Sequence, residues 1–372
     1  MSHTKRPFRI IIVGAGPAGK HSEVAPPKGA GISMWPHGLR IIHQLGCLDA
    51  IKAASVLINR FQGRASDGRL VHDNLFYAHV EENHGIGFFP LERRQFLKIL
   101  YDGLPDKSFI KTGAAVESVR QLPDKVEVQL TDGNVETGDM VLGCDGVHSL
   151  VRSDMWDHAS RSSPGLIQIK EKKSHKASWK TLAMTTPEIS ELGERNLTVT
   201  YIDGVAFLVT SQPDAAYFFV IFRLDMPFTW PKRERYTDGD AEALAELVAD
   251  KPVTNQIVFA EVWKRRNRAV VIALEEYVTE HWHHGRIAVC GDAVHKLHPN
   301  MALGGNSAIE GVVSVINHIN RVMLMTKGPK PSATALNMAF MAYQNEQCQR
   351  MVELMDLSNF VAKIHTYANP FY

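Results

Sequence analysis

Residues suited to binding a nucleotide cofactor gather in three short stretches of the 372-residue chain. The first, Gly14-Ala15-Gly16-Pro17-Ala18-Gly19, directly follows the apolar run 8–13 (FRIIIV). Glycines in that position permit a tight turn that brings backbone amides close to a pyrophosphate, and a following helix adds its N-terminal amides. Such a triplet is sometimes only a structural turn, but directly after an apolar strand it favours a dinucleotide-binding unit.

The other two stretches each place an aspartate at the end of an apolar strand. Asp145 lies in the stretch CDGVHSLVR, and Asp292 lies in GDAVH, which is followed by Pro299 and by Gly304-Gly305-Asn306. An aspartate there can accept hydrogen bonds from a ligand hydroxyl, or it can simply cap a helix. The glycines after the proline would open a helix whose N-terminal amides face an electron-rich ring.

Hydrophobic periodicity predicts the elements that must position these stretches. The runs 8–13 and 287–290 are typical of buried parallel strands, and the alternation over 196–224 predicts antiparallel strands of a second sheet. We expect helices over 36–54 with a break at Gly46, over 91–101, and over 305–325 with Ile309, Val312, Val313 and Ile316 on one apolar side. Residues 113–141 should form a hairpin around Thr131-Asp132-Gly133, with Met140-Val141-Leu142 in its second half. This order predicts an α/β fold, a Rossmann-like three-layer unit with an inserted antiparallel β-sheet domain.

The composition excludes several classes of protein. Lys and Arg number 41 and Asp and Glu number 40, so nothing favours nucleic acid or an anionic membrane as a partner. The sequence contains no run of about 18 apolar residues, and we expect no membrane span. The four cysteines form no CxxC pair, which favours free thiols and a cytoplasmic location.

The three motifs together resemble the group A flavoprotein monooxygenases, the family of aromatic hydroxylases. They read GAGPAG, CDGVHSLVR and GDAVHKLHPNMALGGN. The stretches KGAGISMWPHGLRIIHQLG and LERRQFLKILYDGLP are similar to fungal members that epoxidise or hydroxylate terpenoid, indole-diterpene and meroterpenoid intermediates. The resemblance covers most of residues 8–325.

This resemblance implies FAD as cofactor, NAD(P)H as a transient co-substrate, O2, and a small apolar substrate such as a terpenoid- or polyketide-like secondary metabolite. Tyr217 is the catalytic candidate in the antiparallel sheet, with Tyr201 as a second polar side chain there. The implied cofactor-binding residues are Gly14, Gly16 and Gly19 at the pyrophosphate, Asp292 at the ribitol, Gly304, Gly305 and Asn306 at the isoalloxazine, and also Gly31, Arg94 and Asp145.

The resemblance also implies a division of the chain into four parts. Residues 1–152 would form the first part of the FAD-binding unit, incomplete after Gly19, and residues 281–330 the second part. Residues 153–280 would be the mainly antiparallel substrate region, and residues 331–372 a C-terminal helical tail.

The chain departs from the family directly after the glycine turn. A dinucleotide unit needs an acidic residue about 20 residues further on, at the end of a second strand, to bind the adenosine ribose. Here Gly19 is followed at once by the loop-like stretch KHSEVAPP, so the first helix, the second strand and the ribose carboxylate are missing. Strand 8–13 should then be an exposed edge. In addition, Ala302 replaces the first glycine of the usual run after the proline.

Three alternatives remain open. The chain could be a catalytically impaired or inactive remnant or splice form of such an enzyme, or a flavin oxidoreductase that inserts no oxygen. The third is metal-dependent hydrolysis through His281, His283 and His284, which is disfavoured because no acidic partner stands at ligand spacing in the sequence.

Overall fold

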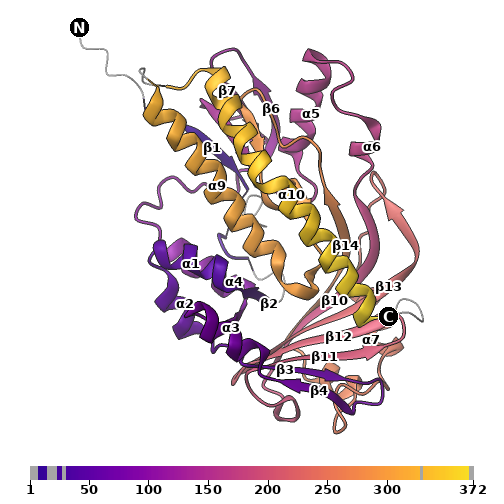
Figure 1. Ribbon diagram of the computed structural model, residues 1–372. Coiled ribbons are helices and arrows are strands. Elements are labelled where there is room, and N and C mark those ends of the chain that lie inside the picture. The colour runs from indigo at the N-terminus through magenta and orange to yellow at the C-terminus, as the bar shows by residue number, and fades with distance from the viewer. Residues whose placement is uncertain (1–6, 15–22, 27–30, 327–329, 368–372) are drawn as a thin grey trace.

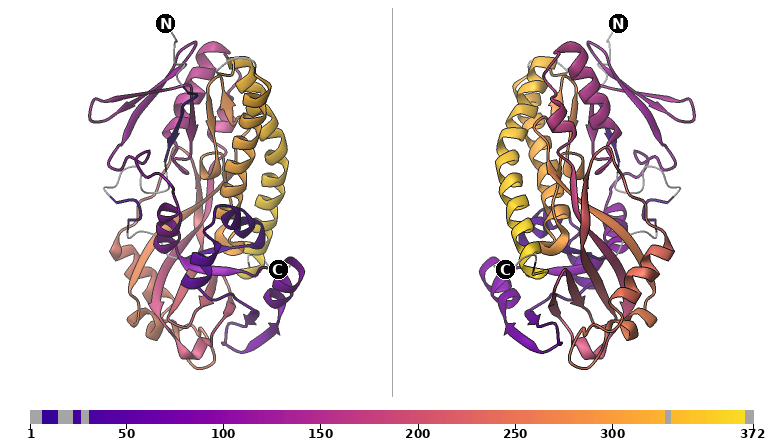
Figure 2. Two further views of the ribbon diagram at one scale, coloured as in Figure 1. Left: turned by 90° about the vertical axis from the view of Figure 1, so that its left-hand side faces the viewer. Right: turned by 90° about the vertical axis from the view of Figure 1, so that its right-hand side faces the viewer.

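The structure is a computed structural model that describes residues 7–14, 23–26, 31–326 and 330–367 (Figure 1). A small parallel sheet lies at one end of the molecule and a large mixed sheet at the other. Two long helices, α9 (Leu303–Met325) and α10 (Ala333–His365), run between the two ends. Figure 2 shows that this helix pair covers one side of the molecule. Among the described residues, no helix is long and apolar enough to cross a membrane.

Each of the three motifs begins where a strand of the parallel sheet ends. The strand order of this sheet is β1-β9-β16-β15, and β1, β9 and β16 are parallel. The predicted strands at 8–13 and 287–290 are thereby confirmed. The four strands are β1 (Ile10–Val13), β9 (Met140–Gly143), β16 (Ile287–Val289) and β15 (His283–His284).

The predicted hairpin at 113–141 is correct only in part. Its turn joins β7 (Val126–Leu130) to β8 (Val135–Gly138), and β6 (Val116–Gln121) pairs with β7 on the other side. Met140-Val141-Leu142 belongs to β9 instead, so its assignment to the hairpin was wrong. The physical reason is that β9 is an inner strand, with β1 and β16 as its neighbours in the sheet, and is buried on both faces. A strand buried on both faces carries consecutive apolar residues and not alternating ones.

The predicted antiparallel strands over 196–224 are confirmed as part of a larger sheet. Its order is β17-β14-β10-β13-β12-β11-β3-β4, and β3 pairs in parallel with β11. The eight strands are β17 (His295–Lys296), β14 (Arg268–Val278), β10 (Lys176–Pro187), β13 (Ala215–Thr229), β12 (Val205–Ser211), β11 (Asn196–Ile202), β3 (Arg60–Arg64) and β4 (Leu70–Asn74). One face packs against two helices, α7 (Asp238–Leu247) and α8 (Phe259–Lys264).

The helices predicted over 36–54 and 91–101 are found close to their expected positions. Gly46 adopts a φ of 73° and separates α1 (Pro36–Gln44) from α2 (Leu48–Ala54). The helix predicted at 91–101 is α4 (Arg93–Asp102), because Leu91 lies in a strand. That strand is β5 (Phe89–Glu92), which pairs with β2 (Gly31–Met34). The remaining elements are α3 (Phe76–His84), α5 (Leu150–Ser162), α6 (Ile169–Lys172), η2 (Ser190–Leu192), η3 (Gly291–Ala293) and η4 (Pro299–Met301).

The buried side of α9 differs from the predicted one. Ile316, expected on the apolar side, is exposed, whereas Gly311 and Ser314 are buried. Small residues are needed there because a Cβ atom at Gly311 would lie only 3.0 Å from the Cys290 sulfur atom. Close packing of α9 against the end of the parallel sheet thus overrides the apolar pattern.

Candidate functional site

The second motif forms the turn from β9 into α5. The Asp145 carboxylate accepts hydrogen bonds from the Ser149 hydroxyl at 2.5 Å and from the backbone amides of Leu150 at 2.7 Å and Val151 at 3.1 Å. The Ser149 hydroxyl accepts a hydrogen bond from the amide of Arg152 at 2.9 Å. Asp145 therefore caps α5, which is the structural alternative that the sequence left open.

A buried arginine ties the second motif to the third. Arg152 is 3% exposed and donates to the carbonyl oxygens of Ala293 at 2.5 Å and Val147 at 2.9 Å. It also donates to the hydroxyl of Tyr277 on β14 at 3.2 Å, and that hydroxyl donates to the carbonyl of Asp292. One sequence signal for this role is an arginine that directly follows the apolar pair Leu150-Val151 at the start of α5. No such signal marks Tyr277.

Asp292 lies in the short turn η3, next to the end of β16. Its side chain is 34% exposed, and one carboxylate oxygen lies 2.6 Å from the Lys296 ammonium group. Arg93 on α4 is half-buried; burial lowers its pKa, and the negative charge of Asp292 partly restores it. Arg93 therefore lies close enough to Asp292 for its pKa to respond to the charge of that carboxylate.

Arg94, the predicted arginine, points elsewhere. Its Nε donates to the carbonyl of Ala25 at 3.0 Å, and its guanidinium group lies 3.8 Å from the Glu23 carboxylate. Successive helical residues point about 100° apart, so only one of the two arginines can face Asp292. Arg93 stands three residues before the buried Phe96 and shares its face of α4, a signal that sequence reasoning missed.

The third motif ends at the uncapped N-terminus of α9. Ala302, the N-cap residue, has a φ of 53° and no side-chain hydrogen bond to the helix, and the first turn contains no acidic residue. A Cβ atom at Gly304 would meet no atom of the described residues within 4 Å, whereas one at Gly305 would lie 3.0 Å from the Ile32 side chain. The first turn of α9 is thus open beside Gly304, and no side chain caps its amides.

Asn306 holds that helix end in place. Its side-chain oxygen accepts a hydrogen bond from the backbone amide of Trp35 at 3.0 Å. Its side-chain nitrogen donates to the carbonyls of Ser33 at 3.0 Å and Ala302 at 2.7 Å. The fully buried amide group therefore positions α9 against the β2–α1 connection.

Gly14, the first residue of the first motif, directly follows β1 at the edge of the parallel sheet. Gly14 has a φ of 99°, and a Cβ atom there would lie 2.5 Å from the Cys144 carbonyl oxygen, so only glycine fits. Gly16 and Gly19 lie outside the described residues. Among the described strands β1 pairs only with β9, and Ile12 is 59% exposed. The expected exposed edge at strand 8–13 is thus confirmed.

Gly31 and Tyr217, both predicted site residues, lie in contact. A Cβ atom at Gly31 would lie 2.9 Å from the Tyr217 side chain, so the absence of a side chain at Gly31 admits the ring. Burial raises the pKa of Tyr217 to about 12, and the charges of Asp214 and Glu92 add to the rise. The hydroxyl group therefore stays protonated at neutral pH. Tyr201, in contrast, packs against the rings of His365 and Tyr367.

An apolar pocket of about 540 Å³ lies between the large sheet, α3 and η4. It reaches the third motif, because Asn300 and Met301 of η4 line it and the Trp35 ring nitrogen donates to the Met301 carbonyl at 2.8 Å. The other lining residues are Phe61, Asn74, Leu75, Phe76, Tyr77, His79, Leu197, Val199, Leu208, Val361 and His365.

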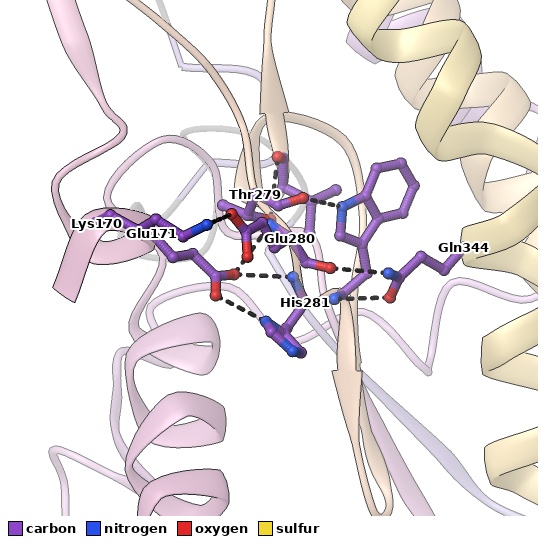
Figure 3. Close-up of polar contacts among 8 residues, drawn as sticks. Lys170, Glu171, Thr279, Glu280, His281 and Gln344 are labelled. Atoms are coloured by element: carbon purple, nitrogen blue, oxygen red, sulfur yellow. Dashed lines mark hydrogen bonds and ion pairs between the residues drawn. The ribbon is translucent and has the colours of Figure 1, made fainter. Parts of the chain in front are cut away.

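The three histidines at 281–284 do not converge on one point. His281 and Glu171 lie 2.7 Å apart (Figure 3). The His284 ring lies 2.9 Å from the Ser162 hydroxyl, and His283 packs near Phe340. The expectation that no acidic partner stands near them was wrong, because ligand atoms of Glu171, Glu280 and His281 lie within 4.8 Å of one another.

The acidic groups beside His281 are already engaged, however. Glu171 accepts hydrogen bonds from the backbone amides of Glu280 at 3.0 Å and His281 at 2.8 Å, and Glu280 pairs with Lys170 at 3.1 Å. Glu171 therefore anchors α6 to the end of β14, and the histidines form no shared catalytic centre.

Comparison with known proteins fits this geometry. The family described as "FAD binding domain" matches residues 20–328. The "FAD-dependent monooxygenase DEP2" of Alternaria brassicicola is 37% identical over 99% of the chain and 73% of its own length, and that of Fusarium langsethiae is 39% identical over 94% and 71%. A Klebsiella pneumoniae HpxO variant complexed with FAD shares the fold, with a TM-score of 0.76, 19% identity, and coverage of 96% of this chain and 90% of its own. The chain belongs to the FAD-dependent monooxygenases, enzymes with a Rossmann-like FAD-binding fold. The fungal relatives do not favour the two alternatives of an oxidoreductase that inserts no oxygen and an inactive remnant.

The comparisons also bear on the length of the chain around its N-terminal motif. The family match begins at Lys20, directly after the glycine turn. The alignment with the Alternaria relative spans 387 residues against the 372 of the chain, so at least 15 residues of that relative have no counterpart here.

The described residues fit one end of FAD better than the other. The open space at Gly304, the uncapped amides of α9 and the partly exposed Asp292 suit the ring and the ribitol. At the adenosine end, the described part of the chain contains no second strand beside β1 and hence no carboxylate at its end.

Proposed function

We propose that the chain uses NAD(P)H and O2 to hydroxylate or epoxidise an apolar small molecule. The observation that carries this proposal is the apolar pocket of about 540 Å³ that adjoins η4, the loop leading into the N-terminus of α9. Its volume suits a ligand larger than a single aromatic ring, and apolar walls with few polar groups are typical of small-molecule sites.

The cofactor roles that we propose divide among the three motifs. Gly14, Gly16 and Gly19 would approach the pyrophosphate, Asp292 would accept hydrogen bonds from ribitol hydroxyls, and Gly304 and Gly305 would direct amides at the ring. Asp145 and Asn306 would act by positioning α5 and α9. We add Arg93 to this set, and Arg94 would instead hold the loop at Glu23–Ala25. We retain the proposed division of the chain at residues 152, 280 and 330.

FAD, when bound, supplies the redox chemistry with NAD(P)H and O2. The residues of this chain contribute binding, orientation and exclusion of water. The walls formed by Phe61, Leu197, Val199 and Leu208 keep water from the reacting carbon, and the protonated Tyr217 hydroxyl can donate a hydrogen bond but cannot act as a base at neutral pH.

The test uses the full chain saturated with FAD. Apolar polycyclic substrates should stimulate NAD(P)H-dependent O2 uptake, and small charged benzoates should not. Phe76→Glu places a charge in the pocket wall and should raise KM at least tenfold, because Phe76 lines the pocket from α3. Phe109→Glu is the matched control, since Phe109 is exposed and does not line the pocket. Stimulation by benzoates alone, or equal effects of the two variants, would contradict the proposal.

A further inference from the structure

A second cleft, of about 1050 Å³, lies away from the cofactor motifs, between α7, α10 and strands β10, β13 and β14. Side chains alternate along β14. Glu275 and Tyr277 point toward the second and third motifs: Glu275 lies 4.0 Å from His148, and the Tyr277 hydroxyl bonds to the Asp292 carbonyl. Glu276 lies between them, points to the opposite face and lines the cleft. Tyr277, which also lines the cleft, thus stands between the cleft and the second and third motifs.

Glu276 has an unusual environment for a carboxyl group. It is 7% exposed, and its Oε1 atom is buried with no hydrogen-bond partner within the described part of the chain. Burial raises its pKa to about 7, against the opposing charges of Lys363 and Lys176. A buried polar atom without a partner is costly, and the residue that carries this cost lines the cleft.

The rest of the lining combines positive charge with apolar surface. Four cationic side chains face two acidic ones, so the cleft keeps a positive balance even with both acids ionised. The cationic residues are Lys176, Lys180, Arg223 and Lys363, and the acidic ones are Asp225 and Glu276. Trp179, Phe222, Leu244, Leu247 and Met355 supply the apolar walls. This combination matches a ligand with an anionic head and an apolar body.

We propose that this cleft binds a small amphipathic carboxylate, with its head between Lys176 and Lys363 and its apolar body along Trp179 and Met355. In its protonated form Glu276 donates a hydrogen bond to the ligand carboxylate, and in its ionised form it repels that group. The affinity therefore rises as the pH falls from 8 to 6, a range in which simple carboxylates stay ionised. The charged groups that act on Glu276 are Lys363 and Lys176; Lys180, Arg223 and Asp225 line the rest of the cleft, and no histidine lines it.

The first experiment compares three ligands by isothermal titration calorimetry with the full chain. Octanoate carries both head and body, 1-octanol carries the body alone, and acetate carries the head alone. Octanoate should bind at least tenfold more tightly than either of the others. Equal affinity for octanol would show that the charge is not recognised, and equal affinity for acetate would show that the apolar walls are not used; either result would overturn the proposal.

The second experiment locates the site. Lys363→Glu should weaken octanoate binding at least tenfold, whereas the matched control Lys264→Glu, an exposed lysine on α8 outside the cleft, should not. Glu276→Gln should bind octanoate with an affinity that no longer changes between pH 6 and pH 8. Thermal melting shows whether each variant is folded. Equal binding by the two lysine variants, or an unchanged pH dependence in Glu276→Gln, would overturn the proposal.

Discussion

The two ends of the proposed cofactor site differ in how well their elements are packed. At the flavin-ring end, Asn306 and Arg152 tie distant segments together through buried hydrogen bonds. At the adenosine end, β1 is an edge strand, and the side chain of Ile12 is 59% exposed. Different contacts thus stabilise the two ends, so on our proposal one half of the cofactor site can stay well packed without the element that would bind the other half.

Restoring the missing segment should have the largest effect on this contrast. A family-type helix, strand and terminal Glu inserted between Gly19 and Lys20 should raise FAD affinity by two to four decades, or about 3–5 kcal/mol, through a charge-assisted hydrogen bond and phosphate-facing amides. Fluorescence titration measures the gain. A Gly/Ser linker of equal length at the same position is the control, and an equal gain from that linker would refute the explanation.

Removing the hydrogen bonds that link the second and third motifs should lower the stability of the fold. Arg152→Ala leaves the carbonyls of Ala293 and Val147 without their donor and should lower the free energy of unfolding by about 3 kcal/mol. Chemical denaturation measures this change. Arg161→Ala, an exposed arginine on the same helix, should change it by less than about 0.5 kcal/mol. Similar losses in both variants would contradict the role given to Arg152.

Asp292→Ala should weaken FAD binding without a matching loss of stability. The loss of one charge-assisted hydrogen bond to a ribitol hydroxyl should weaken FAD binding by roughly 1.5–3 kcal/mol, while the thermal transition stays nearly unchanged because the Asp292–Lys296 pair is partly exposed. Asp157→Ala removes a comparable exposed pair with Lys172 and should leave FAD affinity intact. Unchanged FAD affinity in Asp292→Ala would remove Asp292 from the site.

The smallest effect concerns the helix end at Ala302. The left-handed backbone at this position costs alanine about 1–2 kcal/mol. Glycine removes this strain but loses more chain entropy on folding, so only part of the energy is gained. Ala302→Gly should therefore raise the free energy of unfolding by about 0.5–1 kcal/mol. Ala308→Gly, inside α9, should lower it by a similar amount. A destabilised Ala302→Gly variant would mean that the strain at this position is absent.

The sequence predicted much of this architecture because its signals are local. The glycine turn, both aspartate motifs, the missing segment and the replacement at Ala302 were all visible in short stretches. The links across the site were not, since Asn306 bonds to Trp35 over 271 positions and Arg152 bonds to Ala293 over 141. The positions of Arg93 and Arg94 depend on the rotation of α4, which follows from packing of Phe96, so the sequence alone did not single out Arg93 as the one near Asp292.

The most direct test of the contrast between the two ends compares FAD with FMN on the unmodified chain. FMN carries the ring, the ribitol and one phosphate but lacks the adenosine part. If only the ring end is intact, the two dissociation constants should agree within about tenfold, a difference of no more than about 1.4 kcal/mol. A chain that purifies as a stoichiometric FAD complex and binds FAD at least a thousandfold more tightly than FMN would contradict the account.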